Sequence, residues 1–274
     1  MSQAPVYIES HGLDSPSHLH SAAPQLVFFH GWGMHSGVFK PVVDELQQYF
    51  NILLVDLPGH GHSQPFADFN DIDKCTDYLL SQMQAQLKEQ LQERIILCGW
   101  STGSLIAQNM AIRYPDMIEK LILITGTPSF EMKPGWFKGV DAKVLGRFKD
   151  DLMANFNKTL NRFLALQFMH SEGQKENLRQ ARELVFARPT PDMDMLKAGL
   201  KLLKSTDLRG QLKEIKCPTL ILNGERDSLV PTTAARHLAE EIVDASAIIF
   251  KSSGHAPFLS HSNQFNEYVK QFLI

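Results

Sequence analysis

The stretch CGWSTGS, residues 98–104, places one serine between two glycines at the junction of two different sequence patterns. The apolar run RIIL (94–97) precedes it, and the amphipathic run LIAQNMAIRY (105–114) follows it. Glycine loses more backbone entropy on folding than other residues, so two glycines this close indicate a backbone forced into a tight turn. The serine either caps the following helix or is held out for chemistry.

Six short apolar runs end in glycine or turn residues, which is typical of strands covered on both faces. They are residues 24–31, 51–59, 94–100, 120–126, 218–224 and 246–254. Helical patterns lie between or after them, at residues 38–50, 71–91, 105–114, 232–242 and 264–274. This alternation predicts an α/β fold with a mostly parallel central sheet and right-handed crossovers. VYIES (6–10) is a candidate for an added edge strand.

The alternation stops between residues 130 and 199, where several helical patterns follow one another without a strand. We interpret 130–199 as a helical cap inserted into a core made of 1–129 and 200–274. Residues 130–200 hold 12 Lys and Arg against 9 Asp and Glu, whereas the whole chain carries a net charge of −3. The cap is therefore the basic part of an acidic protein, although an ordinary solvated helical layer would have the same composition.

The composition is that of a globular protein, with 274 residues, 43% hydrophobic and 21% charged. Its net charge argues against nucleic-acid binding. No apolar run reaches the roughly 18 residues of a membrane span, and MSQAPVYIES (1–10) lacks the pattern of a signal peptide. Cys75, Cys98 and Cys217 contain no CxxC pair and are expected to be reduced thiols, not a disulfide frame or metal site. We expect a cytoplasmic monomer.

A serine nucleophile needs a base within hydrogen-bond reach and a carboxylate that orients the base. After a strand–Gly-x-Ser-x-Gly–helix turn, the acid and then the histidine are expected, each following a later strand. Asp227 follows the fifth apolar run, and His255 follows the sixth. Ser101, Asp227 and His255 are therefore predicted to form a catalytic triad, with Glu225 as a rival carboxylate.

The negative charge that develops on a reacting carbonyl oxygen also needs hydrogen-bond donors. One is expected to be the backbone N–H of Thr102, the residue after the serine, and the other should come from a loop after an early strand. HGWG (30–33) follows the first apolar run, and its glycines let the backbone turn so that the N–H of Trp32 faces the serine. Taken alone, HGWG would equally fit a glycine-rich turn.

Five motifs, in order along almost the whole chain, resemble the α/β-hydrolase superfamily. They are HGWG (30–33), DLPGHGHS (56–63), GWSTG (99–103), GERD (224–227) and GH (254–255). Within it, the chain is similar to the pimeloyl-[acyl-carrier protein] methyl ester esterases of biotin synthesis. The narrower resemblance rests on HGWGMHSGVF (30–39), LVDLPGHGHS (54–63), CGWSTGSLIA (98–107), NRFLALQFM (161–169), LKLLKSTDLRGQL (200–212) and GHAPFLSH (254–261).

The resemblance implies an α/β-hydrolase fold and a carboxylesterase that uses no metal or organic cofactor. It implies removal of a methyl group from a pimeloyl chain carried on acyl carrier protein. It assigns Ser101 as nucleophile, His255 as base, Asp227 as the residue that orients the base, and the Trp32 and Thr102 N–H groups as oxyanion donors. Trp32, Trp100 and Phe148 are predicted to line an apolar channel for the acyl chain, although core packing would account equally for each.

Acyl carrier proteins are strongly acidic, so a basic cap would suit transient docking. By resemblance, Arg162 matches a docking arginine, Lys158 stands where an arginine is common, and Arg147 is a further candidate. Lysine keeps the charge but loses the bidentate geometry of arginine.

Other functions share this scaffold. A general short-chain carboxylesterase or a carbon–carbon bond hydrolase would use the same triad. Dehalogenases and epoxide hydrolases place Asp where this chain has Ser101. A ligand receptor built on a hydrolase fold can keep a complete triad, and it would show very slow turnover and ligand-dependent partner binding.

Overall fold

The computed structural model describes residues 5–12 and 23–274, so the first four residues of MSQAPVYIES lie outside the described part. Seven strands form one sheet in the order β1-β3-β2-β4-β5-β6-β7. The strands are β1 (Ile8–His11), β2 (Gln25–Phe29), β3 (Asn51–Val55), β4 (Ile95–Trp100), β5 (Ile118–Ile124), β6 (Thr219–Gly224) and β7 (Ala245–Phe250). Among the described strands, β1 and β3 pair antiparallel and the other pairs are parallel, which confirms the mostly parallel sheet and the added edge strand.

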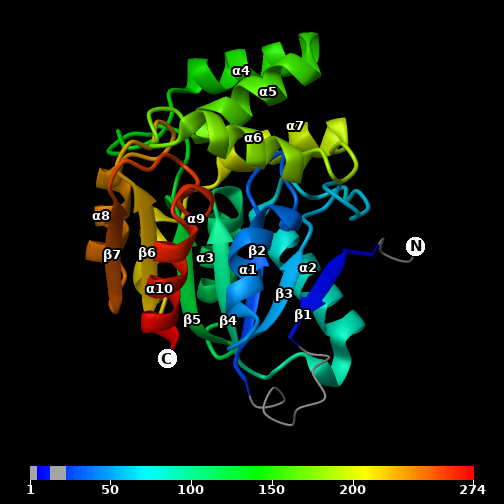
Figure 1. Cartoon of the computed structure of the whole chain (residues 1–274), viewed down its shortest axis with the longest axis vertical. Coiled ribbons are helices and arrows are strands. Elements are labelled where there is room, and N and C mark those ends of the chain that lie inside the picture. Colours follow the sequence, from blue (N-terminus) through cyan, green and yellow to red (C-terminus); the bar gives the residue numbers. More distant parts are fainter. Residues whose placement is uncertain (1–4, 13–22) are drawn as a thin grey trace.

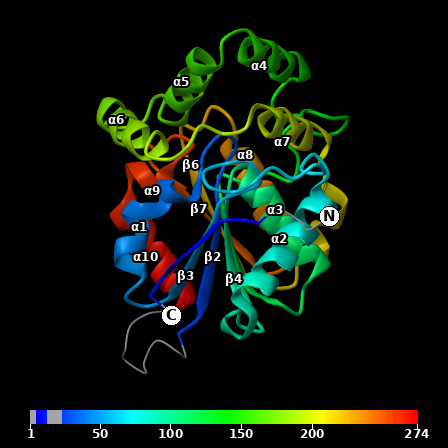
Figure 2. The same ribbon diagram turned by 90° about the vertical axis from the view of Figure 1, so that its right-hand side faces the viewer.

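Helices cover both faces of the sheet (Figures 1 and 2). On one face lie α2 (Ile72–Leu87), α3 (Thr102–Arg113) and α8 (Thr232–Glu241). On the other lie α1 (Lys40–Leu46), α9 (Pro257–Ser260) and α10 (Ser262–Leu273). Because β2 to β6 are buried along their whole length or nearly so, their sequences are apolar runs instead of alternating patterns.

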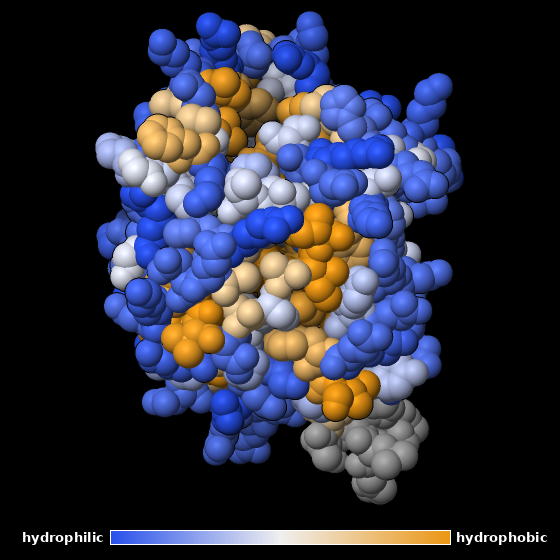
Figure 3. Space-filling view, turned by 90° about the vertical axis from the view of Figure 1, so that its left-hand side faces the viewer, coloured by the Kyte–Doolittle hydropathy of each residue, from blue (hydrophilic) through white to orange (hydrophobic). Residues whose placement is uncertain are grey.

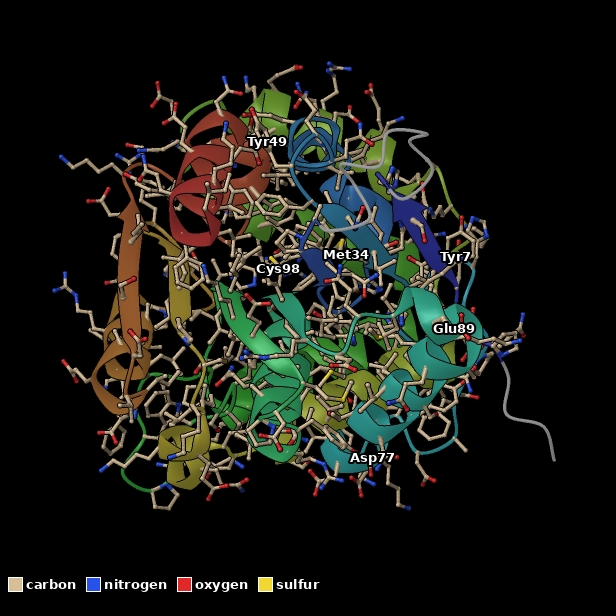
Figure 4. The ribbon with its side chains drawn as sticks, turned by 90° about the horizontal axis from the view of Figure 1, so that it is seen from below. Tyr7, Met34, Tyr49, Asp77, Glu89 and Cys98 are labelled. Carbon is tan, nitrogen blue, oxygen red and sulfur yellow. The ribbon has the colours of Figure 1, made fainter. Side chains whose placement is uncertain are left out.

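β7 differs from the central strands because it forms an edge, and most of its residues are only partly buried. Figure 3 shows the side of the molecule on which β7 lies, where apolar side chains form a band within a mostly hydrophilic surface. In the view from below, Cys98 lies near the centre of the molecule, while Asp77 and Glu89 lie near its periphery (Figure 4). Burial raises the pKa of the Cys98 thiol well above its usual value, consistent with a core-packing residue.

Four helices gather beyond the carboxyl ends of the strands, as Figure 1 shows. They are α4 (Ala142–Ala154), α5 (Phe156–Gln167), α6 (Gln174–Val185) and α7 (Met193–Ser205). Asp141, Asn155 and Asp192 precede α4, α5 and α7, and each side chain accepts a hydrogen bond from a backbone N–H of the first turn. Asn155, the N-cap residue of α5, divides the continuous amphipathic stretch 148–169 between α4 and α5.

In the described residues, no helix is both long enough and apolar enough to cross a membrane. The shorter 3-10 turns are Ser36–Phe39, Lys88–Gln90 and Arg209–Glu214. The first two turns account for part of the difference between the predicted helices 38–50 and 71–91 and the shorter α1 and α2, and residues 47–50 form a turn after α1.

Gly103→Ala tests the close packing of α3 against the sheet. A Cβ at Gly103 would overlap the carbonyl group of Phe29 in the neighbouring strand. We expect urea denaturation to show a free energy of unfolding lower by about 2–4 kcal/mol, as for other overpacked or strained core positions. The matched control is Gly146→Ala in α4, where a Cβ meets no described atom within 4 Å. That control should raise stability by about 0.5–1 kcal/mol, and equal effects of the two substitutions would contradict the packing argument.

Candidate active site

Ser101 occupies the turn between β4 and α3 in a strained backbone conformation. Its φ is 54° and its ψ is −114°, a region that residues with a side chain rarely adopt. A Cβ at Gly99 would overlap the carbonyl of Gly103, so both glycines permit the strand and helix to meet at this angle. The Ser101 side chain makes no cap hydrogen bond to α3. Helix capping therefore does not explain the serine, and the turn has the geometry of a nucleophile elbow.

Asp227 and His255 lie together at the ends of β6 and β7. Asp227 Oδ2 is 2.7 Å from His255 Nδ1, and both side chains are fully buried. The other oxygen of Asp227 accepts hydrogen bonds from the backbone N–H groups of Leu229 (2.8 Å) and Val230 (3.0 Å). The rival carboxylate, Glu225, instead accepts from the N–H of Ser252. Asp227 is therefore the carboxylate placed to orient the imidazole.

The remaining nitrogen of the imidazole, His255 Nε2, is buried and has no hydrogen-bond partner among the described residues. Ser101 lines the cavity above the strand ends and is 6% exposed. The hydrogen bond between a catalytic serine and its base is often long in an enzyme without substrate and shortens in the complex. The structure records no hydrogen bond between Ser101 and His255, and His255 Nε2 is left free to accept a proton.

The two expected oxyanion donors follow adjacent strands: Trp32 lies in the loop after β2, and Thr102 is the first residue of α3, which follows β4. β2 and β4 are neighbours, and the chain leaves them toward opposite faces of the sheet, which is where ligands of open α/β folds bind. A Cβ at Gly31 would lie 3.2 Å from Ser101 Cβ, so the HGWG loop directly contacts the serine. The backbone N–H groups of Trp32 and Thr102 donate to no acceptor within the described ranges. Both remain free to bind an oxyanion.

Two buried histidines hold the HGWG loop in place. His30 Nε2 accepts from the N–H of Leu57 (2.9 Å), and His60 Nε2 accepts from the N–H of Gly33 (3.3 Å). Both rings must therefore be neutral at these nitrogens. Burial, helped by the nearby His60, lowers the pKa of His30 to about 3, and burial lowers the pKa of His60 to about 4.

Hydrogen bonds join the loop that carries His255 to the end of α5 and to the segment that follows it. The sequence analysis did not predict this connection. His255 N–H donates to the carbonyl of Gln167 (2.8 Å), and Gly254 N–H donates to Ser171 Oγ (2.9 Å). Glu172 N–H donates to the carbonyl of Ser252 at 2.9 Å. These hydrogen bonds join residues at least 80 positions apart in the sequence. No local sequence pattern predicts them.

The three aromatic residues predicted to line an acyl channel do not lie together. Trp32 and Phe148 line a cavity of about 100 Å³ that includes Ser101, and their rings meet edge to face at 5.3 Å. Trp100 is not among the residues that line this cavity, because it points to the opposite face of the sheet, toward α1 and α9. Its indole N–H donates to the carbonyl of His255 (2.8 Å), which Thr125 Oγ1 also contacts (3.0 Å). Trp100 supports the histidine loop instead of the channel.

The cavity is almost entirely apolar apart from Ser101. Sequence reasoning missed most of its lining, which is supplied by Phe130, Val140, Val144, Leu145, Phe163, Leu166, Leu200, Leu203 and Leu229. Most of these residues belong to α4, α5 and α7, so the helices beyond the strand ends form the wall opposite the serine.

The three predicted docking residues lie on the outer helices. Arg147 is exposed on α4, and Lys158 and Arg162 are exposed on α5. Arg162 forms an ion pair with Asp151 of α4 at 3.3 Å. Within the described part of the chain, no group of three or more His, Cys, Asp or Glu is placed to hold a metal ion.

Comparison with known proteins agrees with this geometry. A family model described as the alpha/beta hydrolase fold matches residues 24–262. A pimeloyl-[acyl-carrier protein] methyl ester esterase of Vibrio atlanticus is 37% identical over 93% of this chain and 96% of its own length. An esterase of the same name from Nitrosospira multiformis is 34% identical over 99% of both chains. The chain belongs to the pimeloyl-[acyl-carrier protein] methyl ester esterase family of α/β-hydrolases.

Solved structures support the fold of this family member. An esterase from Exiguobacterium antarcticum superposes with a TM-score of 0.85 at 23% identity, over 98% of this chain and 95% of that one. An enol-lactonase from Burkholderia xenovorans superposes with a TM-score of 0.82 at 22% identity, over 98% and 96%. The expected α/β-hydrolase fold is thus confirmed. The esterase relatives at 34–37% identity show that the protein is a carboxylic ester hydrolase.

Asp227→Asn tests the choice of carboxylate. An amide cannot hold the imidazole in the tautomer that accepts the serine proton, so kcat for a p-nitrophenyl ester should fall by about 10³–10⁴-fold. Glu225→Gln is the matched control, because Glu225 contacts only a backbone N–H of Ser252 among the described residues. A larger loss for Glu225→Gln than for Asp227→Asn would show that the wrong acid was assigned.

The low pKa values of His30 and His60 predict acid sensitivity. The unfolded chain binds protons at these residues below pH 6.5, whereas the folded protein does so only near pH 3 and 4. Their contribution to stability is therefore complete above pH 6.5 and is lost as the pH falls to about 4 for His60 and about 3 for His30. Between pH 6 and pH 5, each group should lower the free energy of unfolding by about 1 kcal/mol.

The measurement is the free energy of unfolding in urea from pH 7.5 to pH 5. His60→Gln removes one titrating group. The slope of the free energy of unfolding against pH gives the number of protons taken up on unfolding, and this number should decrease by about one below pH 6.5. An unchanged slope would mean that His60 does not remain neutral in the folded protein.

Proposed function

We propose that this enzyme hydrolyses the methyl ester of a pimeloyl chain carried on acyl carrier protein, a step of biotin synthesis. The observation that carries the proposal is the match to curated esterases of this name over nearly the whole chain, including the helices that form the cavity wall. The apolar cavity above Ser101 suits a methylene chain, and a buried Asp227–His255 pair suits ester hydrolysis.

In the proposed mechanism, Ser101 Oγ attacks the ester carbonyl carbon while His255 Nε2 takes its proton. The N–H groups of Trp32 and Thr102 stabilise the oxyanion. Methanol leaves with the proton returned by His255, and an acyl group remains on Ser101. A water molecule, deprotonated by His255, then attacks this acyl-enzyme and releases the free carboxylate and the serine. No metal or organic cofactor takes part in these steps.

We also propose that residues 130–199 act as a cap whose basic outer surface docks the acidic carrier protein. Arg147, Lys158 and Arg162 are exposed on α4 and α5, which supports this role. The partner of Arg162, Asp151, is itself exposed, so the pair can open at little cost. A monomeric state and a cytoplasmic location stay predictions, the latter supported by three free, buried cysteines.

The test compares methyl pimeloyl-acyl carrier protein with a small p-nitrophenyl ester for the wild type, Ser101→Ala and Arg162→Glu. Ser101→Ala should lower kcat on both substrates by at least about 10⁴-fold. Arg162→Glu should lower kcat/KM about tenfold on the carrier substrate alone, because a charge at the rim of an interface acts mainly on association.

Arg236→Glu on α8 is the control, since Arg236 is exposed and lies outside the cap. Cleavage of the small ester without the carrier substrate would leave a general carboxylesterase. Equal losses on both substrates for Arg162→Glu would rule out docking at this residue.

A further inference from the structure

A second hollow, of about 430 Å³, lies between α4 and α7 on the outside of the cavity wall. We call it the lysine groove, because four of its lining residues are lysines: Lys149, Lys197, Lys201 and Lys204. Asn70 lines it as well, and the lining contains no Asp or Glu. The charged residues that line the groove are therefore all positive.

Most of these lysines have no partner of opposite charge. Lys197 pairs with Asp194 at 2.8 Å, and that aspartate is itself 80% exposed. Lys149, Lys201 and Lys204 form no ion pair with any residue that the structure describes. Lys197, Lys201 and Lys204 are spaced at i, i+4 and i+7, which places like charges on one helix face at a small cost in stability. An anion in the groove would offset that repulsion.

The lysine groove is continuous with the wall of the active-site cavity. Leu145 of α4 and Leu200 of α7 line both hollows. The same two leucines therefore stand between the two hollows, and the groove lies directly behind this part of the cavity wall. The two hollows together form an apolar section beside the serine and a basic section beyond it.

The helical layer is tied to the core at several points, and α7 is one of them, because the carbonyl of Leu196 accepts the indole N–H of Trp32 (2.9 Å). The connection between α5 and α6 is bonded to the His255 loop through Gln167 and Ser171. After α6, Arg188 pairs with Asp56 (3.0 Å) and with Glu9 of β1. Figure 2 shows α6 on one side of this layer and α7 on the other, with α4 above α7. Among the described residues, α4 and α7 form no hydrogen bond with the His255 loop, so a substrate held on the α4–α7 side would leave that loop in place.

We propose that the lysine groove binds the phosphate of the phosphopantetheine arm, the prosthetic group through which acyl carrier proteins hold an acyl chain as a thioester. This inference rests on the proposed function and goes beyond it, because it assigns the arm a site distinct from the exposed docking residues Arg147, Lys158 and Arg162. The methyl ester end of the substrate lies at Ser101, the chain fills the apolar cavity, and the arm leaves between Leu145 and Leu200. Lysine donors then hold the phosphate as a point charge.

The experiment uses two substrates without any carrier protein: methyl pimeloyl-pantetheine, which lacks the phosphate, and methyl pimeloyl-phosphopantetheine, which has it. At low salt, the wild type should show a kcat/KM about five- to tenfold higher for the phosphorylated compound, the size expected from one or two ion pairs at a surface. The preference should decrease as salt is added. In Lys201→Gln/Lys204→Gln, the ratio of the two kcat/KM values should fall to about one.

Lys213→Gln/Lys216→Gln is the matched control, because both residues are exposed lysines outside the groove. This variant should keep the wild-type ratio. A ratio of one in the wild type, or a ratio that the Lys201/Lys204 variant retains, would overturn the groove as the phosphate site while leaving the esterase function in place. If neither compound nor the carrier-bound ester is cleaved in a Ser101-dependent way, the proposed function fails and this inference fails with it.

Discussion

The close approach of α3 to the sheet is the constraint on which the site depends. It exists because Gly99 and Gly103 have no side chains to separate helix from strand, and because Ser101 accepts a φ of 54° between them. This single turn places the serine in the lining of the cavity. It also brings the start of α3 there, where the Thr102 N–H, like other N–H groups of a first helical turn, has no acceptor among the described residues. The local strain is therefore part of the site.

Around this turn, the loops of the site are held mainly by hydrogen bonds between uncharged groups, and less by ion pairs. Two uncharged histidines hold the HGWG loop, and backbone carbonyls and Ser171 hold the His255 loop. The Asp227–His255 pair is the ionisable contact closest to the reaction. The exposed Arg147, Lys158 and Arg162 lie on the outer side of the apolar wall. From there they can bind a charged partner without weakening the attraction between Asp227 and a protonated His255.

Much of this arrangement could be predicted because strand ends are visible in the sequence. Apolar runs ending in glycine located the loops of Ser101, Asp227 and His255, and parallel strands bring such loops to one edge. The face of the sheet to which Trp100 points could not be predicted. In a strand buried on both sides, the residues that face either side are equally apolar, so the sequence does not show which of them face the cavity. The bond between Ser171 and Gly254 was invisible because it depends on where the layer of α4–α7 rests, and no pattern within either segment encodes that position.

The contact between the α5–α6 connection and the His255 loop also bears on how such enzymes can be recombined. A helical insertion is usually regarded as a module that can be exchanged to change substrate preference. Here one stretch of that module, Gln167 to Glu172, forms part of the support for the histidine. A chimaera that imports foreign helices would keep its active site only if the graft retained this stretch and also the contact of α7 with Trp32, whose indole N–H donates to the carbonyl of Leu196 at 2.9 Å.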